Sequence, residues 1–291
     1  MRGVGVSTGA ITIVNALPTG IGSAAGIELA VRAELELRPS GSSERWDVRI
    51  EPPTRTPLVI ESLSESLRCF APGSSGQGEL SLASEVPVAR GLKSSSAVSS
   101  AVALAVARAT DASVGPTDIA AISARASIAA GVSATGAFDD ALAGLTSGIV
   151  VTDNERRTRL AAIPLDPDLR VAVYIPEQTH AAAPDLHARL AREHEAGRRA
   201  AAASLRGDWV EAMRQNSELV ERALGYDYAA ARARLLDAGA LACGVSGLGP
   251  ALAAIAPSDR IASVERMLPG PTSAHRSLRF SSDGPFPREA R

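Results

Sequence analysis

The feature that most constrains the fold is a turn rich in glycine and serine that leads into an apolar helix. Residues 87–97 read Pro-Val-Ala-Arg-Gly-Leu-Lys-Ser-Ser-Ser-Ala, and an Ala/Val-rich segment continues to residue 109. Serine side chains at a helix start lie beside the unpaired backbone N–H groups of the first turn, where the helix dipole adds positive potential. The stretch therefore predicts a site that binds phosphate.

Lys93 lies inside this turn and is the only lysine among the 30 basic Lys and Arg residues of the chain. Arginine fills the other basic positions, so a lysine here indicates a need for a compact ammonium rather than a planar guanidinium. The alternative is an ordinary capped helix in which this lysine has no special role.

Composition narrows the class of protein. The 291 residues suffice for one large domain or two ordinary ones, and 45% hydrophobic with 3% aromatic residues predicts an aliphatic core. A net charge of -2 and scarce aromatic residues argue against a general nucleic-acid binder. Cys69 and Cys243 form neither a disulfide framework nor a metal-binding motif, so we expect a reducing cytoplasm. Neither a signal peptide nor an apolar run that spans a bilayer is expected.

Hydrophobic periodicity predicts a chain that mixes strands and helices. Strands are predicted at residues 2–15 with a break at Gly9, and at 27–37, 46–51, 80–84, 147–152, 169–175, 241–245, 251–256 and 273–280. Helices are predicted at residues 58–70, 94–109, 115–130, 184–204, 208–224, 227–238 and 259–268. Residues 18–26 read as a glycine-rich turn before a strand, whereas the glycines of a dinucleotide-binding fingerprint open a helix.

A second group of candidate residues lies in residues 131–141, Gly-Val-Ser-Ala-Thr-Gly-Ala-Phe-Asp-Asp-Ala. Hydroxyl groups and two adjacent carboxylates, Asp139 and Asp140, precede another Ala/Leu segment. Adjacent carboxylates point in different directions, so one can face a site while the other caps a helix. The alternative is that both form caps or turns.

Three histidines recur every seven residues, at His180, His187 and His194. A metal-binding pair on one helix usually has a spacing of four residues. We therefore expect these histidines on a solvated face.

Three glycine- and serine-rich segments in this order make the chain similar to the GHMP kinase superfamily, which includes galactokinase, homoserine kinase and mevalonate kinase. The first family motif corresponds to residues 15–26, the second to residues 87–97 and the third to residues 244–251. The second motif, Pro-x-x-x-Gly-Leu-x-Ser-Ser-Ser-Ala, matches without a gap. Within the superfamily the chain most resembles the archaeal-type shikimate kinases, through residues 9–16, 90–97 and 131–141.

The resemblance implies an α+β GHMP kinase fold with a ribosomal S5 domain 2-like N-terminal domain and a ferredoxin-like C-terminal domain. The polar turn at residues 153–157 is a candidate boundary. We therefore expect an ATP-binding domain over residues 1–155 and a second domain over residues 156–291, with the active site between them.

The implied activity transfers the γ-phosphate of ATP, with Mg²⁺, to the 3-hydroxyl of shikimate in chorismate and aromatic amino acid biosynthesis. The implied partners are ATP and this small molecule, without nucleic acid or membrane, in a monomer or a homodimer. One alternative is another small-alcohol kinase such as homoserine kinase. A second is a non-catalytic protein that uses the S5-like fold to bind RNA, which the acidic balance and the complete phosphate motif disfavour.

The family motifs also imply roles for individual residues. The ATP phosphates are assigned to Pro87, Arg90, Gly91, Leu92, Lys93, Ser94, Ser95, Ser96 and Ala97. Asp139 aligns with the catalytic aspartate of relatives and is the candidate to orient or deprotonate the hydroxyl, with Lys93 adding positive charge. Shikimate contacts are assigned to Asn15, Thr19, Thr135, Asp139, Gly247 and Gly249. The metal is assigned to Ser95, Ser96 and Asp140.

The chain departs from its relatives at two places. Several relatives bind Mg²⁺ through a glutamate on the helix before the aspartate loop, but residues 119–130 contain no acidic residue and Arg125 holds the nearest position. Either Asp140 takes this role or the metal is held mainly by ATP. Mevalonate kinase-like relatives also carry a lysine near the N-terminal strand, where this chain has none.

Overall fold

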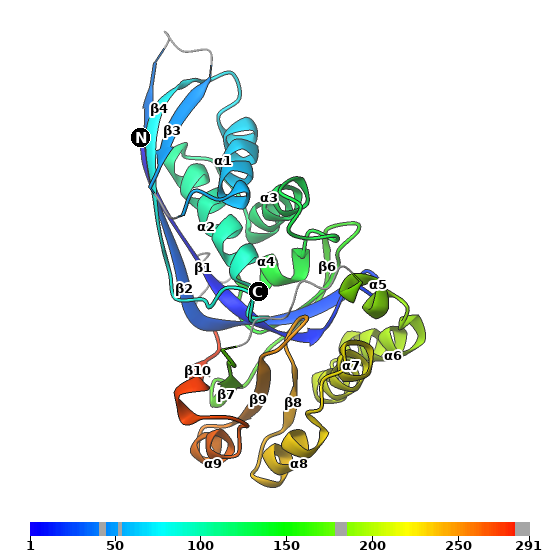
Figure 1. Cartoon of the computed structure of the whole chain (residues 1–291). Helices are drawn as coiled ribbons and strands as arrows, with labels where there is room; N and C mark the ends of the chain where they lie inside the picture. The colour runs from blue at the N-terminus through cyan, green and yellow to red at the C-terminus, as the bar shows by residue number, and fades with distance from the viewer. Residues whose placement is uncertain (41–44, 52–53, 178–184, 283–291) are drawn as a thin grey trace.

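The long strand β2 (Ile21–Pro39) organises the N-terminal half of the chain (Figure 1). The structure, a computed structural model, describes residues 1–40, 45–51, 54–177 and 185–282. β1 (Arg2–Val14) pairs along one edge of β2. β4 (Gly76–Ser84) and β5 (Ile149–Asp153) share the other edge. β3 (Trp46–Ile50) runs parallel to β4, and β6 (Thr158–Ile163) completes the six-stranded sheet beside β5.

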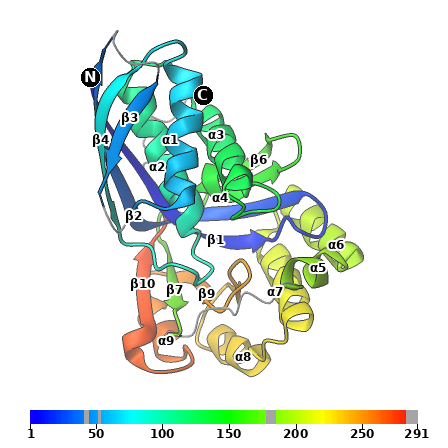
Figure 2. The same cartoon turned by 45° about the horizontal axis from the view of Figure 1, so that its top comes forward.

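Four helices cover one face of this sheet (Figures 1 and 2). They are α1 (Pro57–Phe70), α2 (Ser94–Ala109), α3 (Pro116–Ala129) and α4 (Phe138–Ala143). α2 consists almost entirely of alanine, valine and serine after its first turn, and most of these side chains are buried. Small side chains let this helix lie between the sheet and its neighbours, which fixes the position of its N-terminus.

The second sheet has the order β10-β7-β9-β8 and is antiparallel throughout. Its strands are β7 (Leu169–Tyr174), β8 (Ala242–Val245), β9 (Leu252–Pro257) and β10 (His275–Arg279). The helices of this half are α5 (Leu186–Ala191), α6 (His194–Leu205), α7 (Trp209–Leu224), α8 (Ala229–Asp237), α9 (Ile261–Arg266) and a 3₁₀ turn at Thr272–Ala274. Helices follow the first and third strands, which is the ferredoxin-like β-α-β-β-α-β pattern. The predicted fold class is confirmed.

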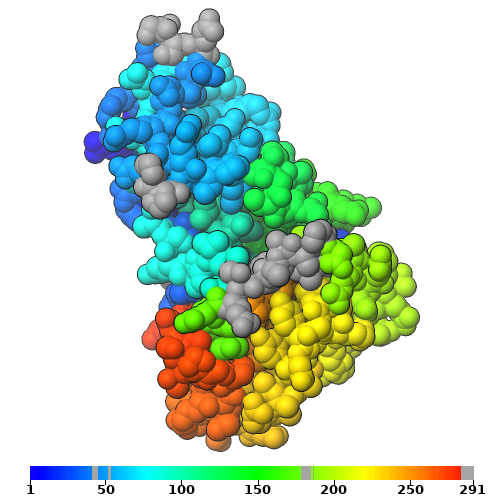
Figure 3. All heavy atoms as spheres, in the orientation of Figure 1, coloured from blue at the N-terminus to red at the C-terminus, as the bar shows by residue number. Residues whose placement is uncertain are grey.

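The N-terminal lobe, blue to cyan, stands above the C-terminal lobe, yellow to red, in the space-filling view (Figure 3). Ile27 of β2 also forms an isolated bridge with Phe280, which ties the two sheets together. Within the described ranges, no helix is both long and apolar enough to cross a membrane.

Two sequence-based expectations about elements are wrong, and one strand has no predicted counterpart. Residues 21–26 belong to β2 rather than to a turn, because Gly22 and Gly26 leave room for α4 to lie against the strand. The helix predicted over residues 184–204 divides into α5 and α6, and residue 184 lies outside the described residues. The strand β6 had no predicted counterpart, since its side chains are mostly exposed and carry little apolar signal.

The predicted domain boundary at residue 155 lies in the turn between β5 and β6. Because β6 pairs with β5, the first sheet continues to Ile163. The division of the chain into domains stays a prediction.

Candidate active site

A cavity of about 310 Å³ lies where loops of the two lobes meet. Its walls come from the end of β1, the start of α2, the loop before α4, the loop after β8 and one residue of α5. Ten of the predicted site residues line it: Asn15, Gly91, Lys93, Ser94, Ser95, Ser96, Thr135, Asp139, Asp140 and Gly247. The structure thus brings three sequence-distant glycine- and serine-rich segments to one place.

The first turn of α2 is open toward this cavity. Lys93 is the N-cap residue, with a left-handed backbone (φ 67°, ψ 32°), and no side chain caps the helix. The first helical hydrogen bond runs from Ala97 N to Lys93 O at 3.0 Å. The N–H groups of residues 94–96 therefore lack a capping side chain, and such groups bind anions. The N-terminus of α2 therefore differs from the alternative, an ordinary helix start that a side chain caps.

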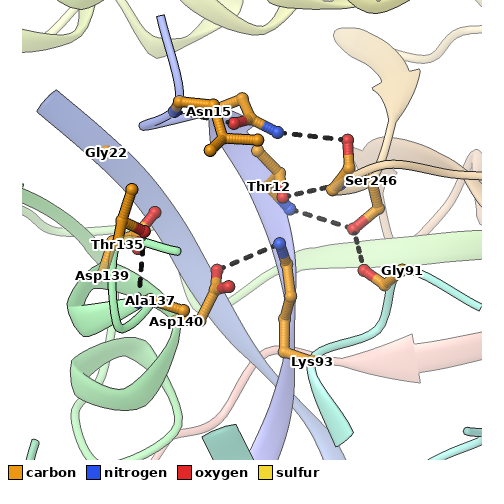
Figure 4. A network of polar contacts seen from close by, with 12 residues as sticks. Thr12, Asn15, Gly22, Gly91, Lys93, Thr135, Ala137, Asp139, Asp140 and Ser246 are labelled. Carbon is orange, nitrogen blue, oxygen red and sulfur yellow. Dashed lines mark hydrogen bonds and ion pairs between the residues drawn. The ribbon is translucent and has the colours of Figure 1, made fainter. Parts of the chain in front are cut away.

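Lys93 forms an ion pair with Asp140, with Nζ 3.1 Å from Oδ1 (Figure 4). Both side chains are largely buried, at 11% and 12% exposure. Burial raises the pKa of Asp140 to about 7; the nearby Asp139 carboxylate also raises it, while Lys93 lowers it. A lysine–aspartate pair is thus present, with the lysine supplied by the start of α2 instead of the N-terminal strand.

Asp139 points away from this pair and into a hydrogen-bonded corner. Asn154 donates from Nδ2 to Asp139 Oδ1 at 2.8 Å, and it accepts at Oδ1 from the Asp139 backbone N–H at 3.2 Å. On the other side, Asp139 Oδ2 lies where a side chain on Gly22 would be, 2.3 Å from an ideal Cβ. Only glycine at position 22 therefore leaves room for the carboxylate.

The loop before α4 explains why the two carboxylates diverge. Phe138 is fully buried and anchors the helix, and Ala137 begins it with a left-handed backbone (φ 51°). Thr135 Oγ1 accepts a hydrogen bond from Ala137 N at 3.3 Å (Figure 4). The carboxylates point in different directions as expected, but neither Asp139 nor Asp140 caps the helix.

One serine hydroxyl joins the second and third motifs to strand β1. Ser246 Oγ donates to Gly91 O at 2.8 Å and accepts from Thr12 N at 3.2 Å. Thr12 Oγ1 in turn accepts from Gly247 N at 2.8 Å. Figure 4 shows this chain of contacts beside the Lys93–Asp140 pair. The loop of the C-terminal lobe is therefore fixed against the phosphate-binding turn and against β1.

Asn15 also belongs to this junction. Its Nδ2 donates to Gly247 O at 3.3 Å, and its Oδ1 accepts from Leu17 N at 3.0 Å. Its backbone N–H donates to Asn216 Oδ1 on α7 at 2.8 Å. The side chain of Asn15 lines the cavity but already serves the loop structure, so its contact with a substrate stays a prediction.

The other predicted site residues do not line the cavity: Pro87, Arg90, Leu92, Ala97, Thr19 and Gly249. Leu92 and Ala97 are core residues, at 0% and 1% exposure. Thr19 Oγ1 accepts from Ile21 N, and Gly249 packs against the ring of Tyr226. These residues support the loops that carry the cavity-lining groups.

Sequence reasoning missed several residues of the site, namely Thr12, Gly22, Asn154, His187 and Ser246. Thr12 and Ser246 stand inside quoted motifs and could have been found there as isolated hydroxyls. His187 and His194 are exposed, as expected for a solvated face, but His187 also lines the cavity; His180 lies outside the described residues. The sequence around Asn154 indicated only a turn.

The described residues contain no group of three or more His, Cys, Asp or Glu side chains placed to hold a metal. Cys69 and Cys243 are both free, as expected.

Comparisons with known proteins agree with this geometry. The family models described as "GHMP kinases N terminal domain" and "GHMP kinases C terminal" match residues 58–148 and 199–271. The shikimate kinase of Halobacterium salinarum is 33% identical over 267 residues, which cover 91% of this chain and 92% of that protein. The shikimate kinase of Archaeoglobus fulgidus is 35% identical over 243 residues, 84% of this chain and 80% of that protein.

Solved structures show the same fold at low sequence identity. Methanococcus jannaschii mevalonate kinase superposes with a TM-score of 0.71 at 12% identity, over 97% of this chain and 99% of that one. Homoserine kinase from Cytophaga hutchinsonii gives 0.67 at 16% identity, over 98% and 96%. With family models on both halves and relatives above 30% identity over most of its length, the chain belongs to the GHMP kinase family.

Proposed function

We propose that this protein is an ATP:shikimate 3-phosphotransferase. The observation that carries the proposal is the likeness to archaeal proteins named shikimate kinase, at 33–35% identity over 84–91% of the chain. In the reaction, the 3-hydroxyl oxygen of shikimate bonds to the γ-phosphorus of ATP and the bond to the bridging β,γ-oxygen breaks. ADP leaves and the hydroxyl proton passes to a protein carboxylate. The predicted cytoplasmic location remains part of this proposal.

The start of α2 holds the β- and γ-phosphates of ATP in this account. Phosphoryl transfer depends mainly on positioning and on charge stabilisation. The uncapped N–H groups of residues 94–96 supply donors, and Gly91 lets the backbone turn close to the ligand. Lys93 supplies the positive charge, 3.1 Å from Asp140.

The residues present fit a magnesium ion that is held mainly by the nucleotide. Asp140 Oδ1 is buried, and its partner among the described residues is the Lys93 ammonium. The hydroxyl groups of Ser95 and Ser96 line the same cavity. Mg²⁺ usually takes one or two carboxylates together with phosphate oxygens and waters, and when bound it neutralises phosphate charge. Asp140, Ser95 and Ser96 are therefore the residues that would hold it.

Asp139 orients the acceptor hydroxyl and takes its proton. The carboxylate lines the cavity, and Oδ2 makes no hydrogen bond within the described part of the chain. A general base needs such a free oxygen within reach of the reacting hydroxyl. Thr135, Asn15 and Gly247 line the space beside it and would contact the polyol.

Coupled ADP release with shikimate, homoserine and mevalonate tested side by side decides the substrate. We expect turnover with shikimate at least about 10³-fold above the other two alcohols, since a site built for polyol hydrogen bonds rejects analogues that lack them. Turnover of homoserine but not shikimate would reassign the chain to a sister kinase. RNA binding on filters without any ATP turnover would favour the non-catalytic alternative.

A substitution tests the role of Asp139 separately. Asp139→Asn keeps the shape of the side chain but removes the base, so kcat should fall by about 10²–10⁴-fold. A normally folded variant with nearly wild-type kcat would remove Asp139 from the mechanism and leave the substrate assignment intact.

A further inference from the structure

Asn154 lies in the turn between β5 and β6, and its side chain contacts Asp139, which lines the active-site cavity. It is 2% exposed and donates from Nδ2 to Asp139 Oδ1 at 2.8 Å. We propose that Asn154 is a positioning residue for Asp139 in phosphoryl transfer. The inference rests on the proposed function, because it gives Asn154 a role only through the proposed base.

The orientation of the Asn154 amide follows from its partners. The Asp139 backbone N–H can only donate, and it points at one end of the amide from 3.2 Å. That end must therefore be the carbonyl oxygen. The Thr152 hydroxyl, itself fully buried, donates to the same oxygen at 2.8 Å. The amide nitrogen is then turned toward Asp139 Oδ1.

The backbone around Asn154 is also fixed. Its N–H donates to Gly20 O at 2.9 Å, which joins the turn to the beginning of β2. The neighbouring Asp153 pairs with Ile21 in the sheet. The donor to Asp139 therefore comes from the edge of a rigid sheet, as a positioning residue requires.

These contacts hold the Asp139 carboxylate in one orientation. Oδ1 is occupied by Asn154, and Oδ2 lies in the space left by the missing side chain of Gly22. Oδ2 is thus the oxygen left for the acceptor hydroxyl. A donor at Oδ1 also opposes rotation of the carboxylate, and a misplacement of about 1 Å can cost about 10²-fold in rate.

The test is a double-mutant cycle on Asp139 and Asn154, with kcat, KM and thermal stability measured for each variant. Asn154→Ala should lower kcat by about 10–100-fold with little change in KM for ATP, as losses of supporting residues typically do. In the Asp139→Asn background the same change should alter kcat by less than about 2-fold, because Asn154 then has no base to position.

A milder pair of variants covers the case in which Asn154→Ala folds poorly. Thr152→Val keeps the shape of the side chain but removes the hydroxyl that orients the amide, so kcat should fall by about 3–10-fold. Thr152→Ser keeps the hydroxyl and should retain nearly wild-type kcat.

Multiplicative effects in the cycle would overturn the proposal, because they indicate a structural role independent of Asp139. Equal kcat for Thr152→Val and Thr152→Ser would count against it in the same way. If the wild-type chain phosphorylates an alcohol other than shikimate, the substrate assignment fails. The same cycle run with that alcohol still decides the role of Asn154.

Discussion

Three largely buried ionisable side chains meet at the cavity, one lysine and two aspartates. Lys93 pairs with Asp140 at 3.1 Å, whereas Asp139 is held by the neutral amide of Asn154. Buried charges are costly unless they are paired or hydrogen-bonded. Among the described residues, Asp139 is thus the carboxylate of the site that no cation pairs with, which suits a group that takes up a proton.

Replacement of Lys93 tests its role at the phosphates. Lys93→Met removes the ammonium and leaves Asp140 unpaired, so kcat should fall by about 10²–10³-fold. Lys93→Arg should recover little, because a planar guanidinium does not reproduce the compact ammonium that lies 3.1 Å from Asp140 Oδ1. Steady-state kinetics check both variants. Arg234→Met, at an exposed position, serves as the control. Nearly wild-type kcat in Lys93→Met would contradict the role of Lys93 at the phosphates.

In the absence of magnesium, the Asp140 carboxyl should make the free energy of unfolding depend on pH. Its pKa in the folded chain is raised, to about 7, by burial. Between about pH 4 and 7 the folded state then binds more protons than the unfolded state, so this group lowers the free energy of unfolding as pH rises. This one group changes the free energy of unfolding by at most about 1.4 kcal/mol per pH unit.

Urea unfolding of the wild type and of Asp140→Asn across this pH range, with a chelator present, checks the expectation. The stability of the variant relative to the wild type should rise with pH. A difference that stays constant with pH would show that Asp140 titrates normally.

Close contacts between elements decide where the carboxylates sit. β2 runs beneath α4, and Asp139 Oδ2 takes the place of a side chain on Gly22. The start of α4 depends on the left-handed residue Ala137 and the buried anchor Phe138. The contact between Gly22 of β2 and Asp139 of α4 joins residues that are more than 100 positions apart in the sequence.

Gly22→Ala should displace Asp139, because the new methyl group would lie 2.3 Å from Oδ2. We expect kcat to fall by about 10²-fold and stability to fall by about 1–3 kcal/mol through overpacking. Kinetics and thermal unfolding measure both effects. Gly115→Ala is a matched control, since its methyl group would meet nothing nearer than Asp118 Oδ2 at 3.7 Å. Wild-type kcat in Gly22→Ala would show that this contact is not needed.

The sequence predicted the elements whose own residues carry the signal. The serine-led helix α2 and the strands of the second sheet follow from periodicity and composition. The contacts that distant segments make within the site could not be predicted in this way. The Lys93–Asp140 pair and the Asn154 contact depend on how distant segments pack, and a polar residue in a turn looks the same whether it faces solvent or a cavity.

Across the whole molecule, the site exists only where the two lobes meet. Ser246 of the C-terminal lobe contacts Gly91 and Thr12 of the N-terminal lobe through one buried hydroxyl. A rigid junction of this kind keeps the phosphate-binding turn in register with the loop that closes the cavity.

Ser246→Ala should loosen that junction. It leaves the part-buried Gly91 carbonyl and the buried Thr12 N–H without this partner, so stability should fall by about 1–3 kcal/mol and KM for ATP should rise. Thermal unfolding and kinetics test this, with Ser277→Ala on an exposed strand position as control. Unchanged stability and KM would mean that the lobes do not depend on this hydroxyl.

The most direct test of the account is a crystal structure of the chain with a non-hydrolysable ATP analogue, Mg²⁺ and shikimate. We expect the β- and γ-phosphates at the N–H groups of residues 94–96, beside Lys93. We also expect the 3-hydroxyl of shikimate within hydrogen-bonding distance of Asp139 Oδ2. A triphosphate bound elsewhere, with the start of α2 facing only solvent, would contradict it.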